Sequence, residues 1–364
     1  MKMSVQLYGY FGLYAVIVII MVVHLGGADT TVTMENKVED LDVVVRNETC
    51  VDDNDGGLGH GNDGQQQLGF GTYEESCPEV EAIVFYWVQN AVSQDPRMAA
   101  SLLRLHFHDC FVNGCDGSVL LDDKGSFVGE KTAAPNLNSL RGFEVVDAIK
   151  SHLEALCPVT VSCADILAFA ARDSVVLSGG PSWEVQTGRR DSLNASKTDA
   201  NANIPGPNSD AATLLAKFQN VGLTLNDMVT LSGAHTMGKA RCSTFTSRFS
   251  TGGATSNGPD VNVDFLQSLQ QLCSNSNTTL AHLDLVTPST FDNQYYVNLV
   301  SGEGLLPSDQ ALAHHDQTRE IVESYANNAA VFFEGFKNSM LKMGGLGALV
   351  GKNGEIRQNC RSIN

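Results

Sequence analysis

Nine cysteines are the feature of this sequence that most restricts how the chain can fold. They are spread from Cys50 to Cys360, and no two of them are separated by two residues, as the thiols of zinc ribbons and redox motifs are. So many thiols without a metal motif are typical of a chain that folds in an oxidising compartment, where cysteines pair as disulfides. Spacing alone leaves the pairing open, because eight cysteines permit many different pairings and a ninth stays unpaired or bonds to another molecule.

The start of the chain indicates how it would reach such a compartment. Lys2 gives a short basic start, residues 11–23 form an apolar run, and residues 26–28 are small, as at a cleavage site. Residues 1–28 are therefore predicted to be a secretory signal peptide. An uncleaved signal anchor is the alternative, because the apolar character extends over residues 8–25, near the minimum of roughly 17 residues for a span. The candidate glycosylation sites in such a compartment are Asn47, Asn194 and Asn277.

Residues 29–72 differ in composition from the rest of the chain. They carry ten acidic residues against two basic ones, about −8 of the chain's net charge of −18. The glycine- and glutamine-rich run at residues 56–67 does not suit a packed core. We therefore expect a disordered, acidic and Gly-rich extension or propeptide, and Cys50 is the odd cysteine within it. The acidic balance argues against nucleic acid or an anionic membrane surface as the main partner.

From Tyr73 onward the sequence is typical of a globular, mainly α-helical domain, which we assign to residues 73–364. Apolar residues recur at helical spacing, strand-like alternation is rare, and there is no internal repeat. Arg189 and Arg190 precede Asp191, a pattern that we interpret as a structural ion-pair network. Helices are expected at residues 80–93, 98–110, 141–156, 163–178, 211–221, 225–231, 264–273, 292–299 and 321–343.

The second of these helices carries the first candidate site. Arg104 and His108 are four residues apart, so they lie on one face of the helix. A fixed cation beside an imidazole can take up a proton while it stabilises developing negative charge. His106 points to another face and is expected to be a packed, hydrogen-bonded structural residue. An alternative is a metallohydrolase that binds zinc through His106, His108 and Asp109, which would need further ligands brought in by the fold.

A glycine-rich bend follows this helix. Cys110 and Cys115 flank it, and Asp109, Asp116 and Ser118 offer hard oxygen ligands that suit Ca2+ better than a transition metal.

The helix and the bend together form the unbroken string RLHFHDCFVNGCDGS at residues 104–118. This string resembles the distal segment of the secretory plant peroxidases, the class III haem peroxidases, and the similarity extends over residues 69–364. The resemblance implies a mainly α, two-lobed helical fold with the haem between a distal and a proximal half and with four disulfides.

The resemblance also implies one haem b, held without covalent attachment because the sequence has no Cys-x-x-Cys-His. His108 would take a proton from H2O2, Arg104 would stabilise the transition state, and Asn136 would fix which ring nitrogen of the histidine acts as base. On the opposite side, His235 would be the axial ligand of the iron. The supporting positions implied by the resemblance are Asp309 beside the axial histidine, Glu130 beside Asn136, and Pro205 at the edge where donors bind.

Two calcium sites and the disulfide pairing are implied in the same way. The distal calcium ligands would be Asp109, Val112, Gly114, Asp116 and Ser118. The proximal calcium ligands would be Thr236, Asp284, Thr287, Thr290 and Asp292, with Thr290 contributing its backbone carbonyl. The disulfides would be Cys77–Cys157, Cys110–Cys115, Cys163–Cys360 and Cys242–Cys273.

Together these expectations describe a secreted haem peroxidase that reduces H2O2 and oxidises small phenolic donors by one-electron steps. Phe107 would shield the iron from bulky donors. The protein is expected to be a monomer in the apoplast, or alternatively in the vacuole, with no nucleic acid and, after cleavage, no membrane as a partner. A binding protein without activity on the same fold is a further alternative, and the five residues Arg104, His108, Asn136, His235 and Asp309 argue against it. The departures from the family pattern are Ser274, Leu283 and the pair Phe249-Ser250.

Overall fold

A computed structural model describes residues 21–25, 28–32, 67–249 and 262–364 of the chain. The chain divides into two units, residues 1–62 and residues 63–364. In the first unit, β1 (Met21–Leu25) pairs antiparallel with β2 (Ala28–Val32). Residues 29–32, expected to be disordered, therefore lie in a strand, in keeping with the strand preference of the β-branched residues there. Most of the predicted signal peptide, and Cys50, lie outside the described residues.

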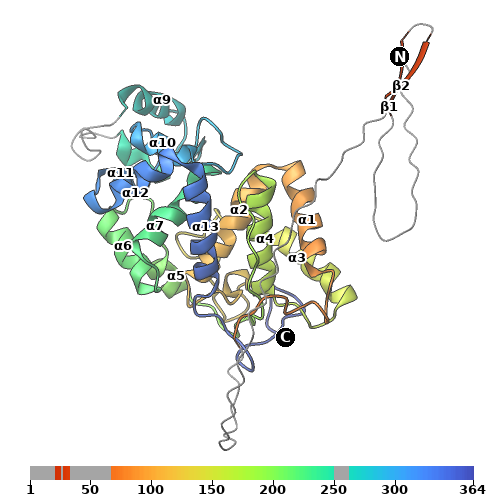
Figure 1. The fold of residues 1–364 in the computed structure, drawn as a ribbon. Helices are drawn as coiled ribbons and strands as arrows, with labels where there is room; N and C mark the ends of the chain where they lie inside the picture. Colours follow the sequence, from red (N-terminus) through yellow and green to blue (C-terminus); the bar gives the residue numbers. More distant parts are fainter. Residues whose placement is uncertain (1–20, 26–27, 33–66, 250–261) are drawn as a thin grey trace, which may run out of the picture. The chain divides into compact units, whose positions relative to one another are not determined.

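The second unit is built almost entirely from helices, as Figure 1 shows. The first lobe contains α1 (Val80–Gln94), α2 (Arg97–Cys110), α3 (Phe143–Leu156) and α4 (Cys163–Leu177). The later helices are α5 (Lys197–Asn203), α6 (Ala211–Asn220), α7 (Leu225–Ser232), α9 (Val263–Cys273), α10 (Gln294–Val300), α11 (Pro307–His314), α12 (Asp316–Asn327) and α13 (Ala329–Gly344). Two short strands, β3 (Lys239–Arg241) and β4 (Leu280–His282), pair antiparallel. The mainly α fold is confirmed.

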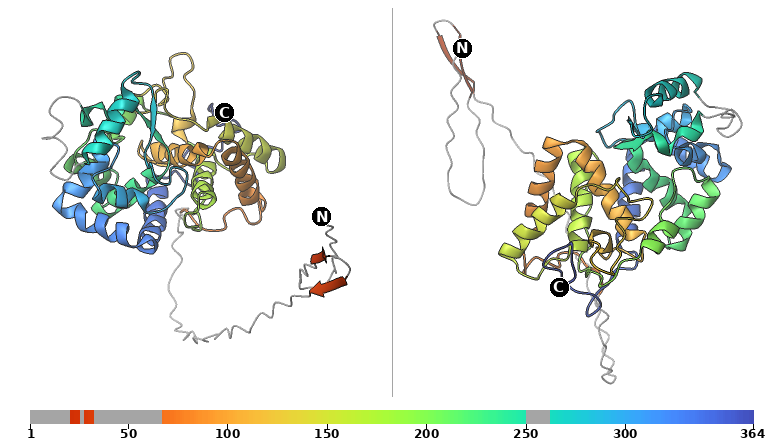
Figure 2. Two further views of the ribbon diagram at one scale, coloured as in Figure 1. Left: turned by 90° about the horizontal axis from the view of Figure 1, so that it is seen from above. Right: turned by 180° about the vertical axis from the view of Figure 1, so that it is seen from behind.

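The helix that carries the candidate site is at the centre of the packing. α2 packs against α4, and α4 packs against α1 on its other side. α4 is buried on nearly every face, which suits its apolar sequence between Cys163 and Val175. α13 contacts both α2 and α7, so it joins the first lobe to the later helices, as the two views of Figure 2 also show. No helix within the described ranges is both long enough and apolar enough to cross a membrane.

Short polar residues set several helix starts. Ser162 Oγ accepts a hydrogen bond from Asp165 N (3.1 Å) at the start of α4, and Thr224 and Asp227 form a capping box at the start of α7. These bonds satisfy backbone N–H groups that a helix start otherwise leaves without partners.

The single helix expected at residues 321–343 is wrong, because the chain breaks at Asn328. This residue has an extended backbone (φ −147°, ψ 97°), and its side chain accepts hydrogen bonds from Ala330 N and Val331 N. It therefore ends α12 and caps α13. The short helices α5 and α11 were not expected from the sequence.

The start of the helical unit also differs from the expected boundary at Tyr73. Gly69 N donates to Thr187 O (3.0 Å) and Thr187 N donates to Gly69 O (2.7 Å). Gly69, which was assigned to the extension, is thus paired with the helical unit. This unit therefore begins before Tyr73.

Four disulfides stabilise this unit, and they join Cys77 to Cys157, Cys110 to Cys115, Cys163 to Cys360, and Cys242 to Cys273. These are the pairs that the resemblance implies. The third ties the C-terminal segment to the start of α4 across a separation of 197 residues, which restricts the unfolded chain.

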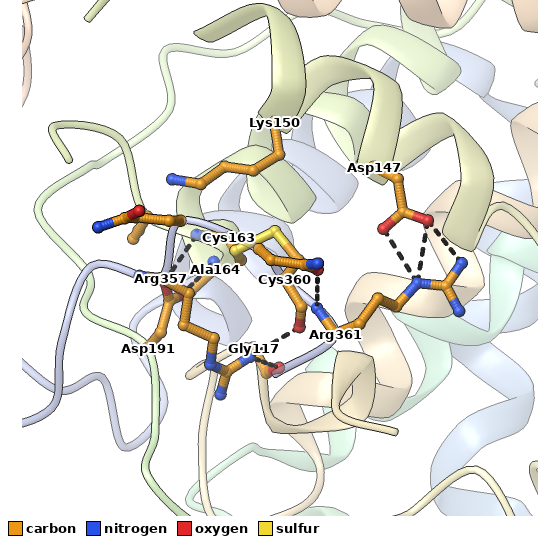
Figure 3. The surroundings of a disulfide bond; sticks show 12 residues. Gly117, Asp147, Lys150, Cys163, Ala164, Asp191, Arg357, Cys360 and Arg361 are labelled. Atoms are coloured by element: carbon orange, nitrogen blue, oxygen red, sulfur yellow. Dashed lines mark hydrogen bonds and ion pairs between the residues drawn. A yellow bond between two sulfur atoms is a disulfide. The ribbon is translucent and has the colours of Figure 1, made fainter. Parts of the chain in front are cut away.

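Figure 3 shows the polar contacts around this third disulfide. The buried carboxylate of Asp191 accepts hydrogen bonds from the backbone N–H groups of Cys163 (3.1 Å), Ala164 (2.9 Å) and Arg357 (3.0 Å). Arg357 Nη1 in turn donates to Gly117 O (2.7 Å), which closes the distal bend against the C-terminal segment. The structural role expected for Asp191 is confirmed by these bonds, since a buried charge needs such partners. The ion pair expected between Asp191 and its neighbouring arginines is wrong, because Arg189 Nη1 pairs with Asp165 Oδ1 (2.7 Å).

Candidate active site

The helix α2 brings Arg104 and His108 to one face, and a turn at residues 135–139 fixes both side chains. His108 is buried, and its Nδ1 lies 2.6 Å from Asn136 Oδ1. Asn136 Nδ2 donates to Glu130 O (2.9 Å), so the amide oxygen is the atom directed at the histidine. An amide oxygen only accepts, so Nδ1 carries the proton and Nε2 is left with a lone pair.

Arg104 provides a fixed positive charge beside this base. Its guanidinium donates to Pro135 O (2.9 Å), Ser139 O (3.0 Å) and Ser139 Oγ (3.1 Å). Burial lowers the pKa of Arg104 to about 10, so the group stays charged at neutral pH. In the described part of the chain it has no carboxylate partner, and its charge remains available to an anion formed nearby.

The same surroundings keep His108 neutral. Burial first, and then the positive charge of Arg104, hold the pKa of His108 well below its ordinary value of 6.5. A neutral imidazole with a free Nε2 can act as a general base at physiological pH.

His106 is buried on a different face, as expected. Its ring nitrogens lie 3.7 and 3.8 Å from Cys110 Sγ, which is disulfide-bonded. A disulfide sulfur is only a weak hydrogen-bond acceptor, so His106 is packed as expected but, within the described residues, lacks the ordinary hydrogen bond that was expected. Burial lowers the pKa of His106 to about 3. Because His106 faces this sulfur and His108 faces Asn136, the two histidines do not converge on one zinc ion, and the metallohydrolase alternative has no ligand set here.

The bend after α2 gathers buried carboxylates. Asp109 accepts from Gly117 N (2.9 Å) and Val119 N (3.3 Å), and Asp116 accepts from Ser118 N (3.0 Å). Burial, with the negative charge of Asp116 as the second cause, raises the pKa of Asp109 well above its ordinary value. Burial likewise raises the pKa of Asp116. Like charges held together in a dry site need a cation if they are to stay ionised.

Two buried oxygens at this bend have no partner within the described residues, and they are Ser118 Oγ and Glu130 Oε2. Burial raises the pKa of Glu130 to about 8. The bend also needs glycine, because Gly114 has a φ of +114° and a Cβ there would lie 2.6 Å from the carbonyl carbon of Gly347. Val112 N donates to Asp109 O (3.1 Å), which keeps Val112 next to these acids. A hard cation with oxygen ligands fits this donor set.

The second candidate centre lies in the short 3₁₀ helix η2 (Gly233–Thr236), directly after α7. His235 Nδ1 lies 2.7 Å from Asp309 Oδ1, and Asp309 is at the start of α11. The His235 side chain is 39% exposed and Asp309 only 3%, so the far edge of the ring faces open space. Gly238 lies against Ala100 of α2, which places this centre next to the helix of Arg104.

Gly233, two residues before His235, is required by the packing of this segment. A Cβ at Gly233 would lie 2.4 Å from Tyr296 Oη and 2.6 Å from the Phe332 ring. The absence of a side chain at Gly233 therefore permits η2 to pack against Tyr296 and Phe332.

The expected proximal calcium residues also lie together. Asp292 Oδ1 accepts from Thr236 Oγ1 (3.0 Å) and Thr287 Oγ1 (3.2 Å). Asp284 Oδ2 accepts from Thr287 Oγ1 (3.2 Å) as well. Thr290 lies in the same turn, closed by its N–H on Thr287 O (3.0 Å). Four side-chain oxygens from two segments thus converge, a set that suits Ca2+.

Pro205 lies in the loop after α5, and this loop is tied to the proximal centre. Ser308 N donates to Pro207 O (3.0 Å), next to Asp309. Phe107, the expected shield, stacks on Phe111 with a centroid separation of 4.1 Å and is partly exposed. Of the departures from the family pattern, Leu283 contacts Gly238, three residues after His235, through its N–H on Gly238 O (3.1 Å).

Comparison with known proteins gives a consistent result for this sequence. The family described as peroxidase matches residues 84–328. The chain is 65% identical to Peroxidase 40 of Arabidopsis thaliana over 303 residues, which cover 82% of this chain and 86% of the relative. It is 51% identical to Peroxidase 4 of Vitis vinifera over 302 residues, 82% of this chain and 92% of the relative. It is 50% identical to Peroxidase 15 of Arabidopsis thaliana over 319 residues, 86% of this chain and 94% of the relative.

Proposed function

The chain belongs to the peroxidase family and is a peroxidase, and from this premise we propose that the residues on α2 and η2 form its active site. The observation that carries the proposal is the pair of oriented histidines. Asn136 holds His108 and Asp309 holds His235, each through Nδ1, so that both rings keep Nε2 for chemistry. A binding protein without activity would have no need for two histidines oriented in this way.

The family implies a haem cofactor, and we propose a single haem b. The donor set suits it, because the bond of His235 Nδ1 to a buried carboxylate leaves a neutral nitrogen on the exposed side of the ring. His235 would hold the iron through Nε2. The bound haem would supply the redox chemistry of peroxide reduction, and the protein would tune it.

The distal residues would move the proton and stabilise charge. His108 Nε2 would take a proton from H2O2 as general base and return it to the departing oxygen. Arg104 would stabilise the negative charge that develops on that oxygen, because its guanidinium is held in place before the reaction begins. Asn136 would keep His108 in the productive tautomer throughout.

The proximal carboxylate would act through the histidine. Asp309 would accept a hydrogen bond from Nδ1 of His235, which would give the imidazole partial anionic character and make it a stronger electron donor to a bound metal. This arrangement favours cleavage of the O–O bond over simple binding of peroxide.

We propose small phenols as the donors, oxidised one electron at a time near Pro205. Phe107 would block direct access of a bulky donor to the iron, which favours electron transfer at the edge of the cofactor over oxygen transfer.

Stoichiometry with a simple phenol and with a thioether tests this proposal. We expect the haem-loaded protein to consume about two phenol molecules for each H2O2, and to leave the thioether largely unoxygenated. Oxygen transfer to the thioether at a rate that rivals phenol oxidation would contradict a shielded iron and edge oxidation. A two-electron product from a single phenol would contradict the one-electron steps.

We further propose two Ca2+ ions that support the two centres. The distal ion would be held by Asp109, Val112, Gly114, Asp116 and Ser118, and the unpartnered Ser118 Oγ supports this assignment. The proximal ion would be held by Thr236, Asp284, Thr287, Thr290 and Asp292. Thr236 directly follows His235 in the sequence. Each ion would thus fix a segment that carries a catalytic histidine.

For the chain as a whole we propose that residues 1–28 are a cleaved signal peptide and that residues 29–72 are an extension or propeptide. We propose residues 73–364 as the catalytic domain, to which Gly69 is also joined by its hydrogen bonds with Thr187. The four disulfides support secretion, because such bonds persist in oxidising compartments. The protein would act as a monomer in the apoplast, with the vacuole as the alternative destination.

A further inference from the structure

The buried carboxylate of Asp309 accepts more than the histidine proton. His235 Nδ1 lies 2.7 Å from Oδ1, and the hydroxyl of Tyr295 donates to the same Oδ1 at 3.2 Å. The second oxygen, Oδ2, accepts from Leu306 N at 3.0 Å. The bond from Leu306 belongs to the helix start of α11, whereas the bond from Tyr295 has no part in any helix or turn.

The surroundings of Tyr295 hold its side chain in place beside Asp309. Tyr295 is on α10 and is buried, with 2% of its surface exposed. Its ring lies edge-on to the His235 imidazole, with centroids 6.2 Å apart and planes at 81°, and edge-on to Tyr296 at 5.0 Å. Burial, and then the negative charge of Asp309, raise the pKa of Tyr295 well above its ordinary value, so the hydroxyl keeps its proton and can donate it in a hydrogen bond.

Two donors on one carboxylate oxygen compete with each other. A hydrogen bond from Tyr295 withdraws charge from Oδ1, which lowers the affinity of Asp309 for the proton on His235 Nδ1. The imidazole then keeps more of that proton and has less anionic character than a carboxylate with a single donor would give it.

We propose that Tyr295 is a positioning residue that acts through Asp309 and sets how strongly His235 donates electrons to the iron. The hydroxyl of Tyr295 holds the carboxylate–histidine pair at an intermediate strength and so raises the reduction potential of the bound haem above the value that Asp309 alone would give. The inference rests on the proposed function, specifically on His235 as the axial ligand.

The neighbouring tyrosine offers a matched control. Tyr296 is also buried on α10, but its hydroxyl donates to Val229 O (3.0 Å) and Thr230 O (3.1 Å), not to Asp309. The two variants Tyr295→Phe and Tyr296→Phe each remove one buried hydroxyl and keep the ring. A general loss of packing or stability would affect both of them, whereas a change in the histidine's electron donation would appear in only one.

The test measures the Fe(III)/Fe(II) reduction potential and the iron–histidine stretching frequency of the haem-loaded ferrous protein, for the wild type and both variants. We expect Tyr295→Phe to shift the potential to a more negative value and the stretching frequency to a higher value, and Tyr296→Phe to leave both unchanged.

An unchanged or more positive potential in Tyr295→Phe would overturn the inference, as would an equal shift in Tyr296→Phe. These results would leave His235 as the ligand. If the wild-type protein shows no iron–histidine band at all, the proposed function fails at His235, and the inference about Tyr295 fails with it.

Discussion

Replacing His108 by alanine is expected to slow the reaction with H2O2 by about 10²- to 10⁴-fold, the usual contribution of a general base. The reason is local, because His108 is the buried, neutral imidazole whose Nε2 is left free by the 2.6 Å bond from Nδ1 to Asn136. Haem binding should persist, since the proposed ligand His235 lies on a separate segment. The measurement is the second-order rate constant for the haem-loaded protein with H2O2 by stopped-flow absorption.

A matched control comes from the same helix. His106 is two residues away, equally buried, and directed at the sulfur of Cys110. His106→Gln should therefore keep a near-normal rate with peroxide, although its stability can fall. Near-normal kinetics in His108→Ala would refute its assignment as the base. An equal loss of rate in both variants would show that the effect is structural.

Removal of calcium is expected to have the second large effect, a clear fall in the unfolding temperature Tm. The distal bend holds Asp109 and Asp116 in a buried cluster, and the proximal site holds Asp284 and Asp292 around two threonine hydroxyls. Without a cation, the buried carboxylates of Asp109 and Asp116 repel each other or must take up protons. A ligand present at about 1,000 times its dissociation constant stabilises the folded state by about 4 kcal/mol, which sets the scale of the loss.

The measurement compares Tm in excess Ca2+ with Tm in a chelator. The variants Asp116→Asn and Asp284→Asn should each reduce the difference, because each removes a negative charge from the ligands of one site. Glu323→Gln changes an exposed carboxylate on α12 and should leave the difference as in the wild type. The same Tm with calcium and with chelator would contradict both proposed sites.

The parts of the fold that the sequence predicts best are those with strong local signals. The apolar periodicity before Arg104 places α2 to within a residue at its start, and the spacing of Arg104 and His108 correctly puts them on one face. α4 is equally clear, because Ser162 caps it and nearly all of its residues are buried.

The errors come from side-chain contacts that the hydrophobic pattern of the sequence does not reveal. Asn328 does not look like a helix break in a long apolar-periodic segment, and it acts as one because its side chain caps α13. Asp292 was expected to begin a helix, but its Oδ1 accepts from Gln294 N (2.9 Å) and from two threonines, and α10 begins only at Gln294.

The candidate site shows the same division. Pairs within one helix can be found by counting, whereas the contact of His235 with Asp309 spans 74 residues and was suggested only by family resemblance. The contact of Tyr295 with Asp309, and the carbonyls of Pro135 and Ser139 that hold Arg104, were missed altogether. A tyrosine in an apolar helix carries no local sign of which carboxylate it will reach, and a backbone acceptor carries no side-chain signature at all.

The absorption spectrum of the purified, haem-reconstituted protein, recorded before and after one equivalent of H2O2 and again after a phenol is added, tests the central claim most directly. The proposed active site predicts a strong Soret band that falls and shifts with peroxide and then returns with the phenol. A Soret band that does not respond to peroxide would contradict the roles of Arg104 and His108. The absence of a Soret band, with calcium present and the disulfides formed, would contradict His235 as the haem ligand.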